Sequence, residues 1–250
     1  MARACVVIPC FDEERRLRPE RFLDFVCAHP DVDFVLVNDG SRDGTLAVLE
    51  SLAREASGRF RVIDQQPNAG KAEAVRRGMR AGFESGAAYV GYWDADLATP
   101  LAAIPEFVTL LDERPDLDLV LGARVKLLGR SVERLSARHY IGRIFATAVS
   151  IALRLAVYDT QCGAKLFRVT PEVRALFEQP FLSRWIFDVE ILARWIAARR
   201  GEGGAPLESA LYELPLREWR DVAGSKLTPA DFARAALELL RIERTYLAHR

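Results

Sequence analysis

The chain has 250 residues, half of them hydrophobic, and its 35 basic residues balance its 35 acidic ones. This length suits one large globular domain, and the composition excludes a disordered chain. The neutral balance argues against a nucleic-acid partner bound through bulk charge. No uninterrupted apolar run reaches the roughly 20 residues that a membrane-spanning helix needs.

The cysteines and the N-terminal residues indicate where the protein works. The four cysteines lack Cys-x-x-Cys spacing and nearby histidines, so neither a zinc site nor a disulfide framework is expected. The apolar run before Pro9 is too short for the core of a signal peptide. We therefore expect a reduced, cytoplasmic protein. The cysteines are Cys5, Cys10, Cys27 and Cys162.

The first half of the chain alternates short apolar runs with polar segments of helical spacing. This alternation is typical of βαβ units, so the sequence predicts an α/β fold with a mostly parallel central sheet flanked by helices. Its continuous apolar runs suit parallel strands that are buried on both faces. The expected strands are residues 4–9, 33–38, 60–64, 89–93 and 117–122, and the expected helices are residues 12–29, 43–57, 71–85 and 100–113.

Beyond residue 124 the alternation stops. The last expected helix begins at Thr228, which would cap it, with Pro229 in its first turn. No repeat or linker divides the chain, so residues 1–250 are expected to form a single domain. The other elements expected here are helices at 137–157, 171–178 and 187–200 and strands at 165–168 and 210–216.

Acidic residues follow three of the expected strands. Glu13 comes after the first, Asp39 after the second, and Asp94 and Asp96 after the fourth. Ligands of parallel sheets bind at the carboxyl ends of the strands. Each group also has an ordinary structural explanation, such as a tight turn into a helix. Their meeting at one edge favours a ligand site, because clustered carboxylates repel unless a cation offsets them.

Paired carboxylates suggest a particular chemistry. Asp94 and Asp96 could hold a divalent cation that bridges to the pyrophosphate of a nucleotide, and Asp39 could accept hydrogen bonds from its base or ribose. No glycine-rich dinucleotide or P-loop motif competes with this site. Lys71 could reach a phosphate, or it could simply begin a helix after a loop.

The motifs, taken in order, resemble those of family 2 glycosyltransferases of the GT-A fold. The early ones are shared by the wide family, whereas those around Asp159 and Asp188 look like the dolichyl-phosphate β-glucosyltransferase branch. The likeness runs from about residue 4 to 245. The motifs are Val6-Val7-Ile8-Pro9, Asn38-Asp39-Gly40-Ser41-Arg42-Asp43-Gly44-Thr45, Asn68-Ala69-Gly70-Lys71, Asp94-Ala95-Asp96, Gly122-Ala123-Arg124, Asp159-Thr160-Gln161-Cys162-Gly163-Ala164-Lys165-Leu166-Phe167, Arg184-Trp185-Ile186-Phe187-Asp188-Val189-Glu190 and Gly224-Ser225-Lys226-Leu227.

The resemblance implies an inverting transfer of a hexose, by preference glucose from UDP-glucose, to a polyprenyl or dolichyl phosphate. It implies Mg²⁺ or Mn²⁺ as cofactor, held by Asp94 and Asp96. Residues 1–124 would form the nucleotide-sugar-binding half of the domain, and residues 125–250 the acceptor-binding half. The nucleotide-sugar site would comprise Pro9, Glu13, Asp39, Lys71, Asp94 and Asp96.

The same resemblance implies catalytic roles for four residues. Asp96 would act through the metal and the diphosphate, and Arg124 would lie near the sugar or the acceptor phosphate. Asp188 falls where a general base or sugar-binding acid is expected. Lys226 would meet the phosphates and the acceptor. A phosphate acceptor is largely a dianion at neutral pH and needs little deprotonation, whereas a hydroxyl acceptor would need the base.

The segment 124–154 carries seven basic residues and the single acid Glu133. Arg130, Arg134 and Arg138 recur every fourth residue and are expected to line one helical face that meets the acceptor. An uncharged stretch follows. This combination suits peripheral contact with the inner face of a membrane, although a solvated face beside an ordinary buried helix has the same pattern.

Other functions share many of these residues. A family 2 enzyme with another donor, such as GDP-mannose, or with a soluble hydroxyl acceptor would keep the same first half. Ala98 stands where mannosyl relatives place a metal-binding glutamine, which disfavours mannose. A nucleotidyltransferase and a nucleotide-binding module without catalysis are further alternatives.

Overall fold

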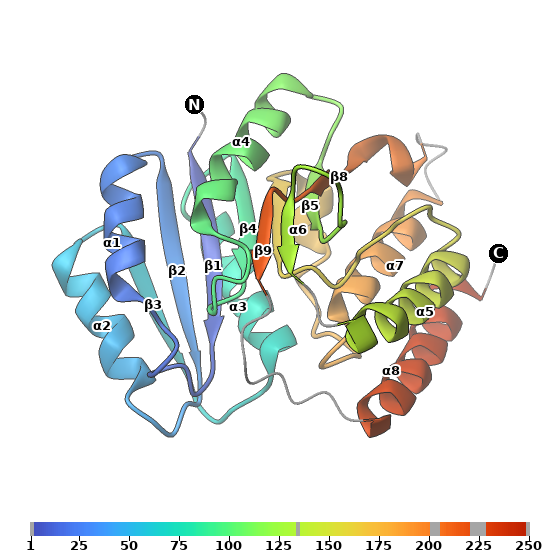
Figure 1. The fold of residues 1–250 in the computed structure, drawn as a ribbon, viewed down its shortest axis with the longest axis horizontal. Helices are drawn as coiled ribbons and strands as arrows, with labels where there is room; N and C mark the ends of the chain where they lie inside the picture. Colours follow the sequence, from blue (N-terminus) through green and yellow to red (C-terminus); the bar gives the residue numbers. More distant parts are fainter. Residues whose placement is uncertain (1–2, 134–135, 201–205, 221–228, 249–250) are drawn as a thin grey trace.

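The computed structural model describes residues 3–133, 136–200, 206–220 and 229–248. Within them, a mostly parallel sheet carries helices on both faces, which confirms the α/β prediction (Figure 1). The strands are β1 (Ala4–Cys10), β2 (Val32–Asp39), β3 (Phe60–Gln65), β4 (Tyr89–Trp93), β5 (Leu119–Ala123), β6 (Ser131–Glu133), β7 (Ala164–Arg168), β8 (Leu211–Pro215) and β9 (Glu218–Arg220).

The helices follow the strands in the order that the sequence predicts. The α-helices are α1 (Pro19–Ala28), α2 (Thr45–Glu55), α3 (Lys71–Phe83), α4 (Ile104–Glu113), α5 (Ser136–Leu153), α6 (Pro171–Ala175), α7 (Phe187–Arg199) and α8 (Pro229–Ile242). Shorter helical turns are η1 (Leu101–Ala103), η2 (Leu207–Ala210) and η3 (Glu243–Leu247). Thr228, the expected cap of the last helix, lies outside the described residues.

The main sheet has the order β3-β2-β1-β4-β7-β5-β8. The chain first builds β1, β2 and β3 toward one edge and then returns to place β4 on the other side of β1. Strand order therefore reverses between β1 and β4. In an open parallel sheet such a reversal point is where ligands bind.

Alternate residues of each central strand enter two separate cores. On β1, Val7 packs with α3, α5, α7 and α8, whereas Val6 and Ile8 pack with α1, α2 and α4. Side chains of a strand alternate between its faces, so a strand buried on both sides must be apolar throughout. The continuous apolar runs of the sequence have this cause.

The second half departs from simple parallel pairing. β7 runs antiparallel to both of its neighbours, β4 and β5, and β8 returns to the parallel direction beside β5. β6 and β9 form a separate two-stranded sheet that the sequence analysis missed. Each has three residues, which is too short for a recognisable apolar pattern.

The structure corrects three sequence expectations, two helix boundaries and the placement of one arginine. The first helix begins at Pro19 rather than near residue 12, because Asp12 has a left-handed φ of 53° and proline favours the first turn of a helix. α5 ends at Leu153, since Arg154 is left-handed with a φ of 51°. Arg130 precedes β6 and lies on no helix, so it cannot share the expected helical face with Arg138.

Within the described ranges, every helix is too short or too polar to cross a membrane.

Candidate active site

The predicted donor-site residues meet at the reversal point of the sheet. Pro9 lies at the end of β1 and Glu13 follows it, while Asp94 and Asp96 follow β4. Asp39 is the last residue of the neighbouring strand β2. Parallel strands bring these positions to one edge, although they are up to 87 residues apart in the sequence.

Two carboxylates in this group, Glu13 and Asp96, lie in an unfavourable electrostatic environment. Burial raises the pKa of Asp96, and the negative charge of Asp94 raises it further. Burial also raises the pKa of Glu13, with Asp94 and Asp96 adding to the effect and Arg16 opposing it. The Oε2 atom of Glu13 is buried without a hydrogen-bond partner. Such an arrangement is stabilised when a cation or a hydrogen-bond donor arrives.

Lys71 supplies part of the missing positive charge. Its Nζ lies 2.5 Å from Oδ1 of Asp94, and it begins α3. Burial alone would raise the pKa of Asp94, but Lys71, with Lys165 and Arg124 farther away, holds it below its ordinary value. Burial alone would lower the pKa of Lys71, but the surrounding carboxylates raise it. Both groups are therefore charged at neutral pH.

The carboxylates Asp94 and Asp96 fit a divalent cation. Mg²⁺ and Mn²⁺ prefer oxygen ligands and often take only one or two carboxylates, with substrate phosphates and water completing the shell. Among the described residues no group of three or more histidine, cysteine or acidic side chains is placed to hold a metal. The remaining ligands would therefore come from the substrate and water.

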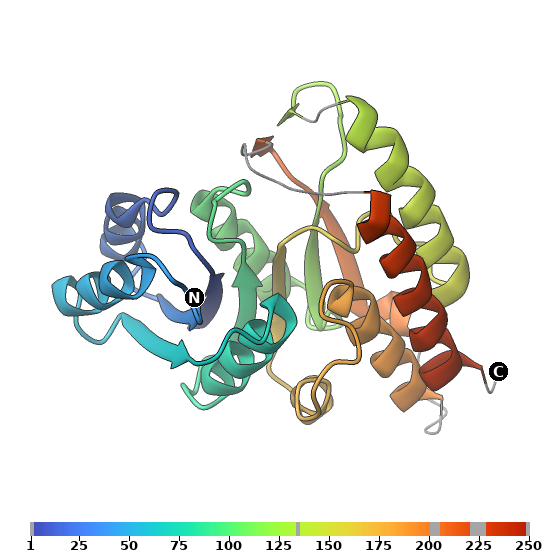
Figure 2. The same cartoon turned by 90° about the horizontal axis from the view of Figure 1, so that it is seen from below.

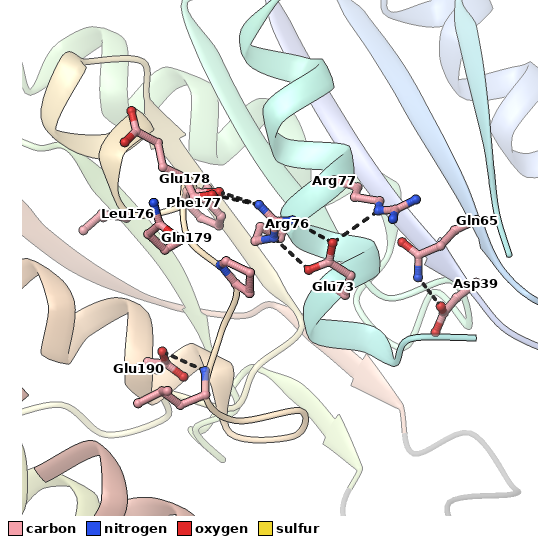
Figure 3. A network of polar contacts seen from close by, with 12 residues as sticks. Asp39, Gln65, Glu73, Arg76, Arg77, Leu176, Phe177, Glu178, Gln179 and Glu190 are labelled. Carbon is pink, nitrogen blue, oxygen red and sulfur yellow. Dashed lines mark hydrogen bonds and ion pairs between the residues drawn. The ribbon is translucent and has the colours of Figure 1, made fainter. Parts of the chain in front are cut away.

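Asp39 is buried, and donors of this chain surround its carboxylate. Oδ1 accepts hydrogen bonds from Gln65 Nε2 (2.5 Å) and the Ala69 amide (2.8 Å), as Figure 3 shows for Gln65. Oδ2 accepts from Asn68 Nδ2 (2.9 Å) and the Gly70 amide (2.9 Å). Asp39 thus shapes the loop that precedes α3. Its expected contact with uridine stays a prediction.

Arg124 is paired within the protein. Its Nε and Nη2 donate to the two carboxylate oxygens of Asp159 at 2.7 and 2.8 Å, and its backbone amide also donates to Asp159. The guanidinium lies 5.4 Å from the ring centre of Trp219. Although burial opposes it, the charge of Asp159 raises the pKa of Arg124. The expected contact with the sugar or acceptor stays a prediction.

Asp188 lies in the first turn of α7 and is 5% exposed. Its Oδ1 accepts a hydrogen bond from the Tyr92 hydroxyl at 2.5 Å and forms an ion pair with Lys165 Nζ at 2.5 Å. Burial, followed by the charge of Asp188, raises the pKa of Tyr92 well above its ordinary value. Lys71 also experiences the charge of Asp188, so this cluster adjoins the carboxylates at the end of β4.

The expected acceptor residues are only partly described. Lys226 and Arg134 lie outside the described residues, and Arg138 lies on α5 with a side chain that is likewise outside the description. Arg130 is half-buried in the turn before β6. Their contact with an acceptor stays a prediction.

Sequence reasoning missed several partners of the predicted residues. Lys165, Tyr92 and Asp159 each bond to a predicted catalytic residue. Asp159 and Lys165 belong to one of the motifs that carry the resemblance, whereas Tyr92 lies within β4. The motif does not show which residues its side chains contact, and β4 shows only an apolar pattern, so no local signal could have identified the pairs.

Comparison with known proteins gives a consistent picture. The profile described as Glycosyl transferase family 2 matches residues 5–172 of this chain. A dolichyl-phosphate beta-glucosyltransferase of Trichomonas vaginalis is 30% identical over 255 residues, which cover 96% of this chain and 72% of that protein. The dolichyl-phosphate beta-glucosyltransferase of Dictyostelium discoideum is 29% identical, over 97% of this chain and 74% of that protein.

A solved structure supports the fold. Glucosyl-3-phosphoglycerate synthase from Mycobacterium tuberculosis, crystallised with Mn²⁺, UDP-glucose and phosphoglyceric acid, superposes with a TM-score of 0.65. The superposition covers 97% of this chain and 80% of that chain at 21% identity. At this identity the likeness shows the fold alone, and it confirms the GT-A architecture that the motifs predict.

Replacement of Asp96 by a neutral residue is expected to stabilise the folded protein, by an amount that depends on pH. Because its pKa is raised in the folded protein, the ionised carboxylate destabilises the fold at neutral pH. Asp96→Asn is expected to increase the free energy of unfolding by about 0.5–2 kcal/mol at pH 7. The gain should vanish as the pH falls through the raised pKa to below the ordinary value of 3.8, because Asp96 is then protonated in both states.

Urea unfolding at pH 7 and pH 3 measures this difference. The matched control is Asp24→Asn, which removes an exposed carboxylate on α1. A variant Asp96→Asn that is no more stable than the control at pH 7 would contradict the electrostatic account of the site.

Proposed function

This chain belongs to glycosyl transferase family 2, and from that premise we propose that it transfers glucose from UDP-glucose to a polyprenyl or dolichyl phosphate. The observation that carries the proposal is the group of carboxylates at the ends of β1 and β4, of which Asp94 is paired with Lys71. Buried carboxylates whose negative charge is only partly offset suit a divalent cation, which can also bind a nucleotide diphosphate. The named activity of the relatives from Trichomonas vaginalis and Dictyostelium discoideum supports the acceptor.

The donor would bind in the first half of the domain, residues 1–124. Pro9, Glu13 and Asp39 would face the uridine, and the unpartnered Oε2 of Glu13 is ready to accept a hydrogen bond. Asp94 and Asp96 would hold Mg²⁺ or Mn²⁺. Bound there, the metal would supply positive charge to the leaving diphosphate.

Residues 125–250 would form the acceptor-binding half. The acceptor phosphate oxygen would attack the anomeric carbon on the face opposite to UDP. The new bond would join that oxygen to the sugar, while the bond between the sugar and the UDP oxygen breaks, with inversion. Lys226 and Arg124 would stabilise negative charge on the phosphates. UDP would leave with the electron pair of the broken bond.

The surroundings of Asp188 favour a phosphate over a hydroxyl acceptor. Its Oδ1 already accepts a hydrogen bond from the Tyr92 hydroxyl and forms an ion pair with Lys165 Nζ, so these contacts occupy the oxygen that would otherwise meet the proton of a hydroxyl acceptor. A phosphate monoester with a second pKa near ~6 is largely deprotonated at neutral pH and needs no strong base. In this proposal Asp188 orients the sugar.

Exposed apolar side chains on the second half support contact with a membrane surface. α5 and α8 lie side by side (Figures 1 and 2). On α5, Ile144 is 73% exposed and Ile151 71%, and the seven-residue spacing puts them on one face. α8 exposes Leu237 and Leu240, and the loop after β5 exposes Leu128. A lipid-linked acceptor would be reached from such a surface.

The described cysteines are all free thiols, as in a reducing compartment. This supports a location at the inner, cytoplasmic face of the membrane.

Donor and acceptor are tested by turnover. UDP-glucose, UDP-galactose and GDP-mannose are each supplied with Mg²⁺ or Mn²⁺, with and without a short polyprenyl phosphate, and the released nucleotide is measured. We expect consumption of UDP-glucose that depends on both the lipid and the metal. Turnover of another donor would overturn the choice of glucose. Turnover with a soluble hydroxyl compound, but not with the lipid phosphate, would overturn the acceptor.

Two substitutions separate metal binding from base catalysis. Asp96→Asn is expected to lower kcat about 10²-fold to 10³-fold, because it removes a ligand of the cation that stabilises the leaving group. Asp188→Asn should lose only about tenfold, because a phosphate acceptor needs no proton removed. Steady-state kinetics at pH 7 measure both. An equal or larger loss for Asp188→Asn would point to a hydroxyl acceptor.

The membrane surface is tested by vesicle co-sedimentation. The double variant Ile144→Glu/Ile151→Glu is expected to bind anionic phospholipid vesicles about tenfold less tightly, because two carboxylates replace two apolar contacts. The control Ala47→Glu/Thr109→Glu adds the same charge at exposed positions of α2 and α4. Equal binding by the two double variants would exclude this face.

A further inference from the structure

Arg184 lies in the loop that leads into α7, four residues before Asp188. Its guanidinium packs against Gly70, so that a Cβ built on this glycine would lie 3.1 Å from Nε and 3.3 Å from Nη2. The next residue, Lys71, forms the ion pair with Asp94. The guanidinium of Arg184 therefore stands at the rim of the candidate active site.

Hydrogen bonds fix the backbone of the loop that carries Arg184. The buried carboxylate of Glu190 accepts hydrogen bonds from the backbone amides of Leu182 and Ser183, both at 3.0 Å. The hydroxyl of Ser183 accepts from the Ile186 amide at 2.7 Å. These bonds lie on both sides of Arg184 in the sequence, so its backbone has a defined place beside α3.

Two other arginines of this protein, Arg76 and Arg194, have structural roles. Arg76 is buried, binds Glu73 through two nitrogens, and donates to the carbonyl oxygen of Glu178 (Figure 3). Arg194 binds Glu190 and several carbonyl oxygens. Arg184, in contrast, is exposed and makes no hydrogen bond or ion pair with any residue that the structure describes.

Other cations near Arg184 are paired. Each of three basic side chains forms an ion pair with its own carboxylate, whereas no ion pair of Arg184 with a described residue is found. The pairs are Lys71 with Asp94, Lys165 with Asp188 and Arg124 with Asp159.

We propose that Arg184 binds a phosphate group of a substrate at the rim of the active site. The inference rests on the proposed function and adds to it a residue whose role nothing else assigns. A guanidinium can donate two parallel hydrogen bonds to a phosphate, and its exposure here leaves those donors available. The phosphate is that of the acceptor or the diphosphate of the donor, and the following test distinguishes them.

Binding is measured by calorimetry without turnover. The probes are UDP with Mn²⁺, farnesyl phosphate, and farnesol as an acceptor analogue without phosphate. Arg184→Gln is expected to weaken one phosphate probe about 10-fold to 100-fold, the range of a charge-assisted hydrogen-bonded contact. Arg184→Lys should recover part of the loss. Loss toward farnesyl phosphate assigns Arg184 to the acceptor, and loss toward UDP assigns it to the donor.

The matched control is Arg80→Gln, which removes an exposed arginine at the other end of α3. Thermal unfolding checks that all variants fold. The inference is overturned if Arg184→Gln binds both phosphate probes as tightly as the control does, or if its affinity for farnesol falls equally. If the unmodified protein binds neither UDP nor farnesyl phosphate, both the inference and the proposed function are wrong.

Discussion

Repulsion between carboxylates at the ends of β1 and β4 is the constraint on which the rest of the site depends. Parallel strands deliver Glu13, Asp94 and Asp96 to one edge, where burial and mutual charge raise the pKa of Glu13 and Asp96. Such a cluster opposes folding. Its retention at the reversal point of the sheet is understandable if a bound cation and a nucleotide diphosphate offset the repulsion.

The second half of the chain supplies the counter-charges. β7 is inserted antiparallel between β4 and β5, and this insertion places Lys165 against Asp188 of α7. Arg124 follows β5 and pairs with Asp159, in the segment before β7. The departure from parallel pairing is therefore what connects the predicted nucleotide edge to the predicted acceptor half. Without β7 in this position, the negative charge of Asp188 would be buried without a cation, which is costly.

The sequence predicts the first half of the fold well, because that half depends on local patterns. Apolar runs and helical spacing determine where β1 to β4 and α2 to α4 lie. The parts that were missed depend on contacts between distant segments. The direction of β7 follows from its pairing with β4, in which Tyr89 meets Arg168 from 79 residues further along the chain. The small sheet likewise joins Val132 to Trp219.

The same distinction holds for the site. Acidic residues at strand ends can be found from sequence, because strand direction alone brings them together. The environment of Asp188 cannot, since Tyr92 is 96 residues away and belongs to a strand with no polar pattern. That environment matters for the chemistry. Oδ1 of Asp188 is already occupied by a hydrogen bond from the Tyr92 phenol and an ion pair with the Lys165 ammonium. The acceptor that suits this site is therefore one that arrives deprotonated, as a phosphate does.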